Sequence, residues 1–178
     1  GFIDSPFIRW DSLATDDGTG TRHNIVYEPP TAITNDNFKT ACDHWLNGGS
    51  EDTYGHISDW DVSDVIHMNS AFKSNTVGNN PFNEDISKWD VGNVTDMTEM
   101  FFNCQNFNQN LSGWDVGRVT SFSGMFGKAY AFDIDLSTWK IGENLGGNDT
   151  ITMDSMFTNC QNFNQDLSGW DVGRVTSF

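Results

Sequence analysis

The most regular feature of the chain is a hydrophobic pattern that returns about every 25 residues. Five tryptophans mark the pattern: Trp60, Trp89, Trp114, Trp139 and Trp170. Their spacings of 29, 25, 25 and 31 residues indicate a repeated unit with two insertions. A phenylalanine column follows the tryptophans, at Phe72, Phe101, Phe126 and Phe157. We predict that these Trp and Phe side chains form the structural core of every repeat.

Within one unit, the order of apolar and polar positions predicts three short elements. Leu or Ile, Trp and Val near the start favour a short strand, and the spacing of Val94, Met97 and Met100 favours a helical turn. Asn or Asp after the next Phe predicts a tight turn. Such a unit cannot bury its apolar face alone, so successive units must stack. The expected fold is therefore an α/β repeat solenoid, leucine-rich-repeat-like, with short parallel strands and helical turns in each coil.

The expected domain organisation has three parts. Residues 1–30 form an extended N-terminal arm, and residues 31–50 form an N-terminal helical cap. The cap is predicted because Thr34 can begin a helix and the apolar residues from Phe38 to Leu46 fall on one stripe. The repeat solenoid occupies residues 51–178, with coils near 57–85, 86–110, 111–135, 136–166 and 167–178.

The last of these coils is truncated, because the chain stops in the middle of a unit at Phe178. No second capping pattern precedes this point. We expect the array to continue in a longer protein, and the alternative is a partner that covers the open end.

The composition narrows the classes of function. The chain has 25 acidic and 9 basic residues, a net charge of −16, which disfavours nucleic acid and anionic lipid as partners. No apolar run approaches the roughly 18 residues that a membrane-spanning helix needs. Seven Trp and fourteen Phe exclude a disordered acidic tail, because such tails are poor in aromatic residues.

A column of aspartates beside the tryptophans is the first candidate for chemistry. It consists of Asp61, Asp90, Asp115 and Asp171, and Lys140 interrupts it. One hypothesis is a cation ladder for calcium, because hard cations take oxygen ligands. The other, which the thin coordination of one carboxylate per coil favours, is that each Asp accepts a backbone N–H bond in its turn. We expect no cofactor, with calcium as the alternative.

The remaining reactive residue types show no catalytic or zinc-binding spacing. His23, His44, His56 and His67 lack paired ligand motifs, and no nucleophile motif is present, so we expect no enzyme activity. Cys42, Cys104 and Cys160 are expected to be small core residues. Cys104 and Cys160 lie two coils apart, roughly 10 Å, which is too far for a disulfide. Asn83, Asn108 and Asn164, with Asp133 in the same column, are expected to form a ladder that satisfies turn backbone.

One sequon is a glycosylation candidate. Asn148 lies in the Gly-rich insertion "GENLGGNDT", at residues 142–150, where we expect an accessible surface loop.

Two stretches resemble a known repeat family. They are "YGHISDWDVSDVIHMNSAF" and "FNQNLSGWDVGRVTSFSGMF", and the second returns from residue 163 with one change as far as Phe178. They resemble the BspA-like bacterial surface-protein repeat, which also occurs in algae, protists and large viruses and is grouped with leucine-rich repeats. The resemblance implies an extracytoplasmic, non-enzymatic protein of adhesion or assembly, and it brings no catalytic residues. The sequence "WKI" from Trp139 departs from the "WDV" of the other units.

The sequence therefore predicts an interaction module rather than an enzyme. We expect a protein–protein or protein–glycan interaction module of a surface or secreted protein, acting through the sheet face of the repeats. The alternative is a structural subunit of a filament, shell or membrane supercomplex, docked through its N-terminal arm. The expected location is extracellular or at the cell surface, with an organelle lumen or a virion as alternatives. An ice-binding role is disfavoured, because only one Thr recurs per coil, at Thr95, Thr120 and Thr176.

Overall fold

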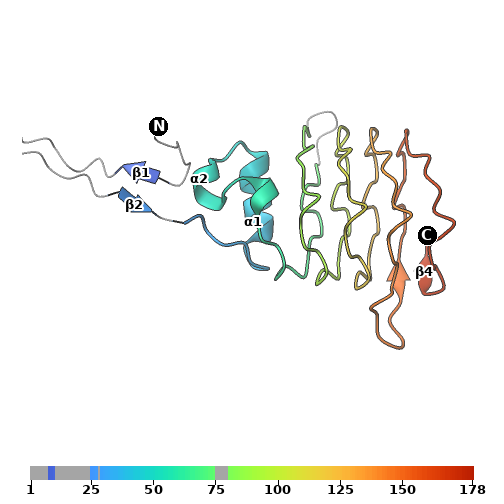
Figure 1. Cartoon of the computed structure of the whole chain (residues 1–178). Helices are drawn as coiled ribbons and strands as arrows, with labels where there is room; N and C mark the ends of the chain where they lie inside the picture. Colours follow the sequence, from blue (N-terminus) through green and yellow to red (C-terminus); the bar gives the residue numbers. More distant parts are fainter. Residues whose placement is uncertain (1–7, 11–24, 28, 75–79) are drawn as a thin grey trace, which may run out of the picture.

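The computed structural model describes residues 8–10, 25–27, 29–74 and 80–178. Strand β1 (Ile8–Trp10) pairs antiparallel with β2 (Ile25–Tyr27). Helices α1 (Phe38–Leu46) and α2 (Glu51–Tyr54) follow, and then a 3₁₀ turn at Ile57–Asp59. The only other strands in the described ranges are β3 (Ile151–Thr152) and β4 (Val175–Ser177), which pair in parallel. Figure 1 shows the two helices at one end of a row of narrow loops, one loop for each repeat.

The expected α/β repeat solenoid is wrong. The described chain is mostly turns and loops, with two short helices ahead of the repeats and strands only in two two-stranded sheets. Strand character in the middle repeats is limited to isolated parallel bridges, His67 to Asp96, Asp96 to Ser121 and Ser121 to Thr152. Beyond the single β3–β4 pair, the described repeats thus have neither the continuous parallel sheet nor the helical turns that a leucine-rich-repeat-like coil requires.

Left-handed backbone explains why the predicted helical turns do not form. In the second repeat the amide of Met100 donates to Met97 O (3.2 Å), and the residue before it, Glu99, has φ of +53°. The amide of Cys104 likewise donates to Phe101 O (3.0 Å), with φ of +63° at Asn103. A positive φ at the third residue of a turn is typical of type II turns and ends an α-helix at once. Each repeat is therefore a series of tight turns.

Helix α1 lies within the residues expected to form the cap, but it begins at Phe38 rather than at Thr34. Residues 35–37 form a turn, which two reciprocal bonds close: Thr34 N donates to Asn37 Oδ1 (2.8 Å) and Asn37 N donates to Thr34 Oγ1 (3.3 Å). Phe38, Ala41 and Cys42 are fully or almost fully buried on the predicted stripe. The ring of Phe38 packs edge-on against Trp89, with centroids 5.7 Å apart, so the helix covers the first repeats.

Aromatic rings in register fill the interior of the repeats. Phe101 stacks on Phe72 at 5.7 Å and on Phe126 at 5.6 Å, and Phe126 stacks on Phe157 at 5.6 Å. Each indole N–H of the tryptophan column reaches a main-chain carbonyl; Trp114 donates to Ile86 O (3.2 Å) and Trp139 to Leu111 O (2.9 Å). The column Trp60, Trp89, Trp114 and Trp139 is buried, and Trp170 is partly buried. Buried indoles with satisfied N–H groups fix the register of one repeat on the next.

Candidate interaction site

A ladder of hydrogen bonds runs across four repeats and defines one continuous surface. Met68 N donates to Asp96 O, Met97 N to Ser121 O and Phe122 N to Thr152 O, each at 2.9 Å. We call the outward-facing side chains of residues 67–74, 96–103, 121–128 and 152–159 the ladder face. It lies over the stretch of each repeat that the sequence predicted to be a helical turn, not over the predicted strand, and turns and isolated bridges build it.

Hydroxyl groups from neighbouring repeats contact one another along the ladder face. Thr98 Oγ1 lies 2.7 Å from Ser121 Oγ, and Thr152 Oγ1 donates to Ser121 Oγ at 3.1 Å. Ser123 Oγ donates to Thr152 Oγ1 at 3.1 Å and approaches Asp154 Oδ2 at 3.4 Å. These four hydroxyl-bearing residues are half-buried, and each hydroxyl can both donate and accept. The row presents polar groups in fixed positions that a ligand with hydroxyl or amide groups can match.

A half-buried phenylalanine adds an aromatic surface beside this row. The Lys73 and Lys128 ammonium groups lie 5.5 and 5.3 Å from the centre of the Phe102 ring, within the range of cation–π attraction. Lys73 also pairs with Glu99, with Nζ and Oε2 2.6 Å apart. Gly127 leaves room for the ring, because a Cβ there would lie 2.8 Å from Phe102 Cδ2. Phe102 was not singled out in the sequence, since it follows the core residue Phe101 and has no counterpart in the other repeats.

The aspartate column accepts backbone bonds at the corners of the repeats. Asp61 Oδ1 accepts from Ser63 N (3.1 Å), Asp90 from Gly92 N (3.1 Å), Asp115 from Gly117 N (3.0 Å) and Asp171 from Gly173 N (2.9 Å). The hydrogen bonds of the Ser63 hydroxyl and amide lower the pKa of Asp61. In the described residues, no group of three or more His, Cys, Asp or Glu is placed to hold a metal ion. The geometry assigns these carboxylates to Asx turns, and the calcium ladder gains no support from it.

Two further polar columns stabilise the turns. Asn83 Oδ1 accepts from Asn108 N (2.9 Å), Asn108 Oδ1 from Asp133 N (3.0 Å) and Asp133 Oδ1 from Asn164 N (2.9 Å), so the expected ladder joins successive repeats. A second column of Asx turns was not predicted from the sequence; in it Asp85, Asn110, Asp135 and Asp166 accept from a Ser amide two residues later. Its signal was visible in the sequence, as Asp or Asn two residues before each Ser.

The cysteines lie in the interior as free thiols. Cys42 and Cys104 are fully buried and Cys160 is half-buried. Cys104 Sγ donates to Phe72 O and Cys160 Sγ to Ala129 O, each at 3.1 Å. Burial raises the pKa of the Cys104 thiol far above its ordinary value. The pKa of the Cys160 thiol is raised to about 12, mainly by burial and to a smaller extent by the negative charge of the nearby Asp133.

The remaining sequence candidates do not converge on one site. Asn148 is exposed on its insertion, and its glycosylation stays a prediction. His44 contacts Ser50 O through Nε2 (3.0 Å), whereas His56 contacts Ser58 Oγ through Nδ1 (2.8 Å). His23 lies outside the described residues, as do residues 1–7 and 11–24 of the expected N-terminal arm.

Comparison with protein-family models gives a match in two ranges of the chain. A family model described as "Mycoplasma protein of unknown function, DUF285" matches residues 40–149 and 143–178, and the two matches span all the repeats. No curated protein matches the chain, and no solved structure does. Among the helices in the described ranges, none is long and apolar enough to cross a membrane.

Proposed function

The chain belongs to the DUF285 family, and from this premise we propose that it is a non-enzymatic interaction module of a surface or secreted protein. The proposal extends the resemblance of its repeats to the BspA-like surface-protein repeat. Its partner would be a protein or a glycan, and its binding surface would be the ladder face.

The observation that carries this proposal is the repetition of polar groups on one face in fixed register. Hydrogen bonds join the hydroxyls of a row of four residues, Thr98, Ser121, Ser123 and Thr152. These side chains therefore have fixed positions before a ligand binds. Preorganised groups reduce the entropy that binding costs. The adjacent Phe102 ring, over which the ammonium groups of Lys73 and Lys128 lie, adds an aromatic side chain of the kind that anchors protein interfaces.

The experiment compares matched variants on defined probes. The labelled chain is applied to an array of immobilised glycans and to purified extracellular-matrix proteins. For a probe bound through the ladder face, Phe102→Ala removes about 2 kcal/mol of binding free energy, or about thirtyfold in Kd, because hot-spot aromatic residues contribute this much. Glu143→Gln, at an exposed site off the ladder face, is the control and leaves the Kd unchanged. Absence of binding to every probe, or equal binding by both variants, contradicts the proposal.

A second candidate function is a structural subunit of a larger assembly, and one observation favours it. Within the units at 136–166 and 167–178 an apolar hollow of about 500 Å³ is lined by residues that include Met156, Phe157, Trp170 and Phe178. The side chain of Phe178 is 76 % exposed. Sedimentation at increasing concentration distinguishes the two candidates: a constant monomer mass supports the interaction module, and growth in mass that Phe178→Ser abolishes supports the subunit.

A further inference from the structure

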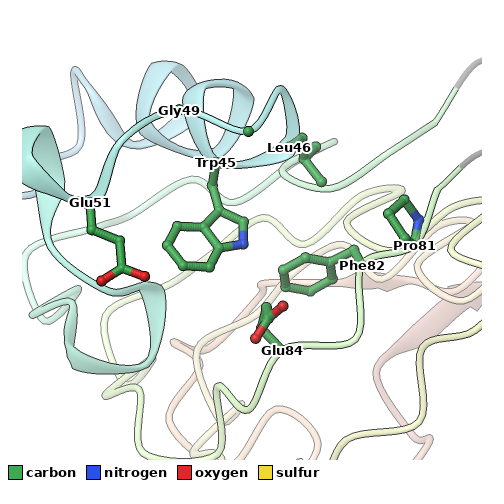
Figure 2. A pocket seen from close by; sticks show the side chains of 8 residues that line it. Trp45, Leu46, Gly49, Glu51, Pro81, Phe82 and Glu84 are labelled. Carbon is green, nitrogen blue, oxygen red and sulfur yellow. The ribbon is translucent and has the colours of Figure 1, made fainter.

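A pocket lies between the helical end of the chain and the first repeats, away from the ladder face. It has a volume of about 380 Å³ and is lined by Trp45, Leu46, Gly48, Gly49, Glu51, Pro81, Phe82 and Glu84. Figure 2 shows Trp45 and Phe82 as neighbouring aromatic walls, with the Glu51 carboxylate beside Trp45 and the Glu84 carboxylate next to the Phe82 ring. Because the pocket shares no residue with the ladder face, a ligand of the pocket is independent of the proposed function.

The pocket is lined by two acidic side chains, and no basic side chain among its described lining residues neutralises them. Glu51 comes from the first turn of α2 and Glu84 from the segment after Phe82. Among the residues that the structure describes, no Lys or Arg lines the pocket. Within the described residues neither carboxylate makes an ion pair; the pairs there are Lys39 with Asp43 and Lys73 with Glu99. Two such carboxylates beside a cavity attract a cation and repel anions.

The aromatic wall favours an organic cation over a metal ion. The partly buried Trp45 indole is held edge-on by His56, with ring centres 5.0 Å apart, and by Trp60 at 6.4 Å. Trp is the best side chain for cation–π attraction, and its ring offers no oxygen ligand to a hard metal ion. Apolar atoms of Leu46 and Pro81 can take the alkyl part of a ligand.

Both walls of the pocket are fixed before a ligand binds. On the helical side Gly49 N donates to His44 O (2.8 Å), and His44 Nε2 contacts Ser50 O (3.0 Å). The His44 ring fills the place of a side chain at Gly49, because a Cβ there would lie 2.2 Å from Nε2. On the other side the buried Asn80 accepts from Phe82 N (2.9 Å) and donates to Phe72 O (2.6 Å). Rigid walls reduce the entropic cost of binding.

We infer that this pocket binds an alkylammonium group, either of a lysine side chain on a protein partner or of a free amine. The ammonium lies between the Glu51 and Glu84 carboxylates against the face of Trp45, and the methylene chain contacts Leu46 and Pro81. A single ammonium in a solvent-open site is expected to bind weakly, with a Kd of roughly millimolar, because cation–π and exposed ion-pair attractions are individually small.

Titration of the ¹⁵N-labelled chain with Nα-acetyl-lysine methylamide tests the inference. The Trp45 indole resonance, assigned through Trp45→Phe, is expected to shift with saturation, while the buried Trp114 indole stays in place. The doubly acetylated lysine amide, which has the same shape without the charge, is expected to give no saturable shift. Glu51→Gln with Glu84→Gln raises the Kd about tenfold, since two weak ion attractions are removed. The control variant Glu143→Gln leaves the Kd unchanged.

The source of the ammonium is distinguished by a second probe, n-butylammonium chloride. A Kd equal to that of the lysine amide assigns the site to free amines, whereas a Kd several times larger assigns it to lysine of a protein. The inference is overturned by a saturable shift with the neutral amide, by an unchanged Kd in the double Gln variant, or by no shift with either cation. The Gln variants keep the shape of each side chain, and unchanged melting curves verify that they are folded.

Discussion

Two segments of this molecule have nearly the same sequence and very different surroundings. Residues 103–122 and residues 159–178 differ at one position among twenty, Asn110 against Asp166. In the first copy Phe122 is fully buried, whereas its equivalent Phe178 is 76 % exposed. Val116 and Val172 show the same contrast, at 1 % and 43 % exposure. Burial in this fold is therefore decided by the neighbouring repeat rather than by the residue itself.

The largest expected effect is a difference in stability between Trp114→Ala and Trp170→Ala. Both indoles donate to a carbonyl of the preceding repeat, but Trp114 is 3 % exposed and Trp170 is only partly buried. Trp114→Ala is expected to lower the free energy of unfolding by about 3–5 kcal/mol, as buried aromatic truncations do, and Trp170→Ala by about half of that. Urea unfolding followed by circular dichroism measures both, and equal losses would contradict the comparison.

The second largest effect is expected in the rates at which the two equivalent cysteines react with a thiol reagent. Cys104 and Cys160 occupy the same place in the two copies, and both thiols have raised pKa values, but only Cys160 is partly accessible. We expect Cys160 to react with a thiol reagent at neutral pH about a hundredfold faster than Cys104, because labelling of a buried thiol requires local opening. Mass spectrometry after limited labelling locates the modified residue. Equal labelling of Cys104 would indicate that the middle repeats open as readily as the last one.

A smaller effect is expected at one turn position that different residues occupy in neighbouring repeats. Gly124 has φ of +64°, and Ser155, at the same position in the next repeat, has φ of +56°. Ser155→Gly is expected to stabilise the fold by about 1 kcal/mol, since a non-glycine residue is strained in this region. Gly124→Ala is expected to destabilise it by about 1–2 kcal/mol. The added Cβ would also lie 3.1 Å from Glu99 Cγ.

Thermal melts of these two variants and the parent chain provide the measurement. Shifts of the melting temperature in opposite directions are expected, and shifts of the same sign would be inconsistent with left-handed turns at this position.

The smallest effect concerns the single difference between the copies. Asn110 and Asp166 both accept the amide of the Ser two residues later, at 3.0 and 2.9 Å, but only Asp166 can titrate. The hydrogen bonds from Ser168, first that of its amide, lower the folded pKa of Asp166 below its ordinary value of 3.8. Its stabilising contribution is therefore complete above that ordinary value and is lost as the pH falls through the lower folded pKa.

Asp166→Asn is expected to reduce the acid sensitivity of the last repeat slightly, and Asn110→Asp to add a similar sensitivity in the middle. Melting temperatures measured from pH 5 down to pH 2 check the sign. Greater acid sensitivity in Asp166→Asn than in the parent chain would show that the carboxylate does not act as this turn acceptor.

The sequence predicted the positions of the repeats and which residues stack on one another, but not the backbone conformation within each repeat. The spacing of the tryptophans located the repeats, because side chains that stack must recur at equivalent positions. The conformation between them was missed, since Glu99 and Lys128 adopt positive φ although neither residue type favours it. These left-handed residues convert the expected helical turn into type II turns.

The ladder face and the cation pocket were only partly visible in the sequence. Ser and Thr of the hydroxyl row were not singled out in the sequence, because only their contacts across repeats distinguish them from other polar positions. Trp45 was recognised as part of the amphipathic stripe of the helix, but Glu84 lies 39 positions further along the chain. Only the packing of the helical end on the first repeat places the two beside one pocket.

Hydrogen exchange tests most directly whether the neighbouring repeat decides the state of each copy. In the first copy Asn103 N donates to Gly127 O (2.7 Å) and Phe122 N to Thr152 O (2.9 Å). In the described structure no backbone bond is made by the equivalent amides of Asn159 and Phe178. Native-state exchange read by NMR is expected to show strong protection of Asn103 and Phe122 and rapid exchange of Asn159 and Phe178. Equal protection of the two copies would contradict the account.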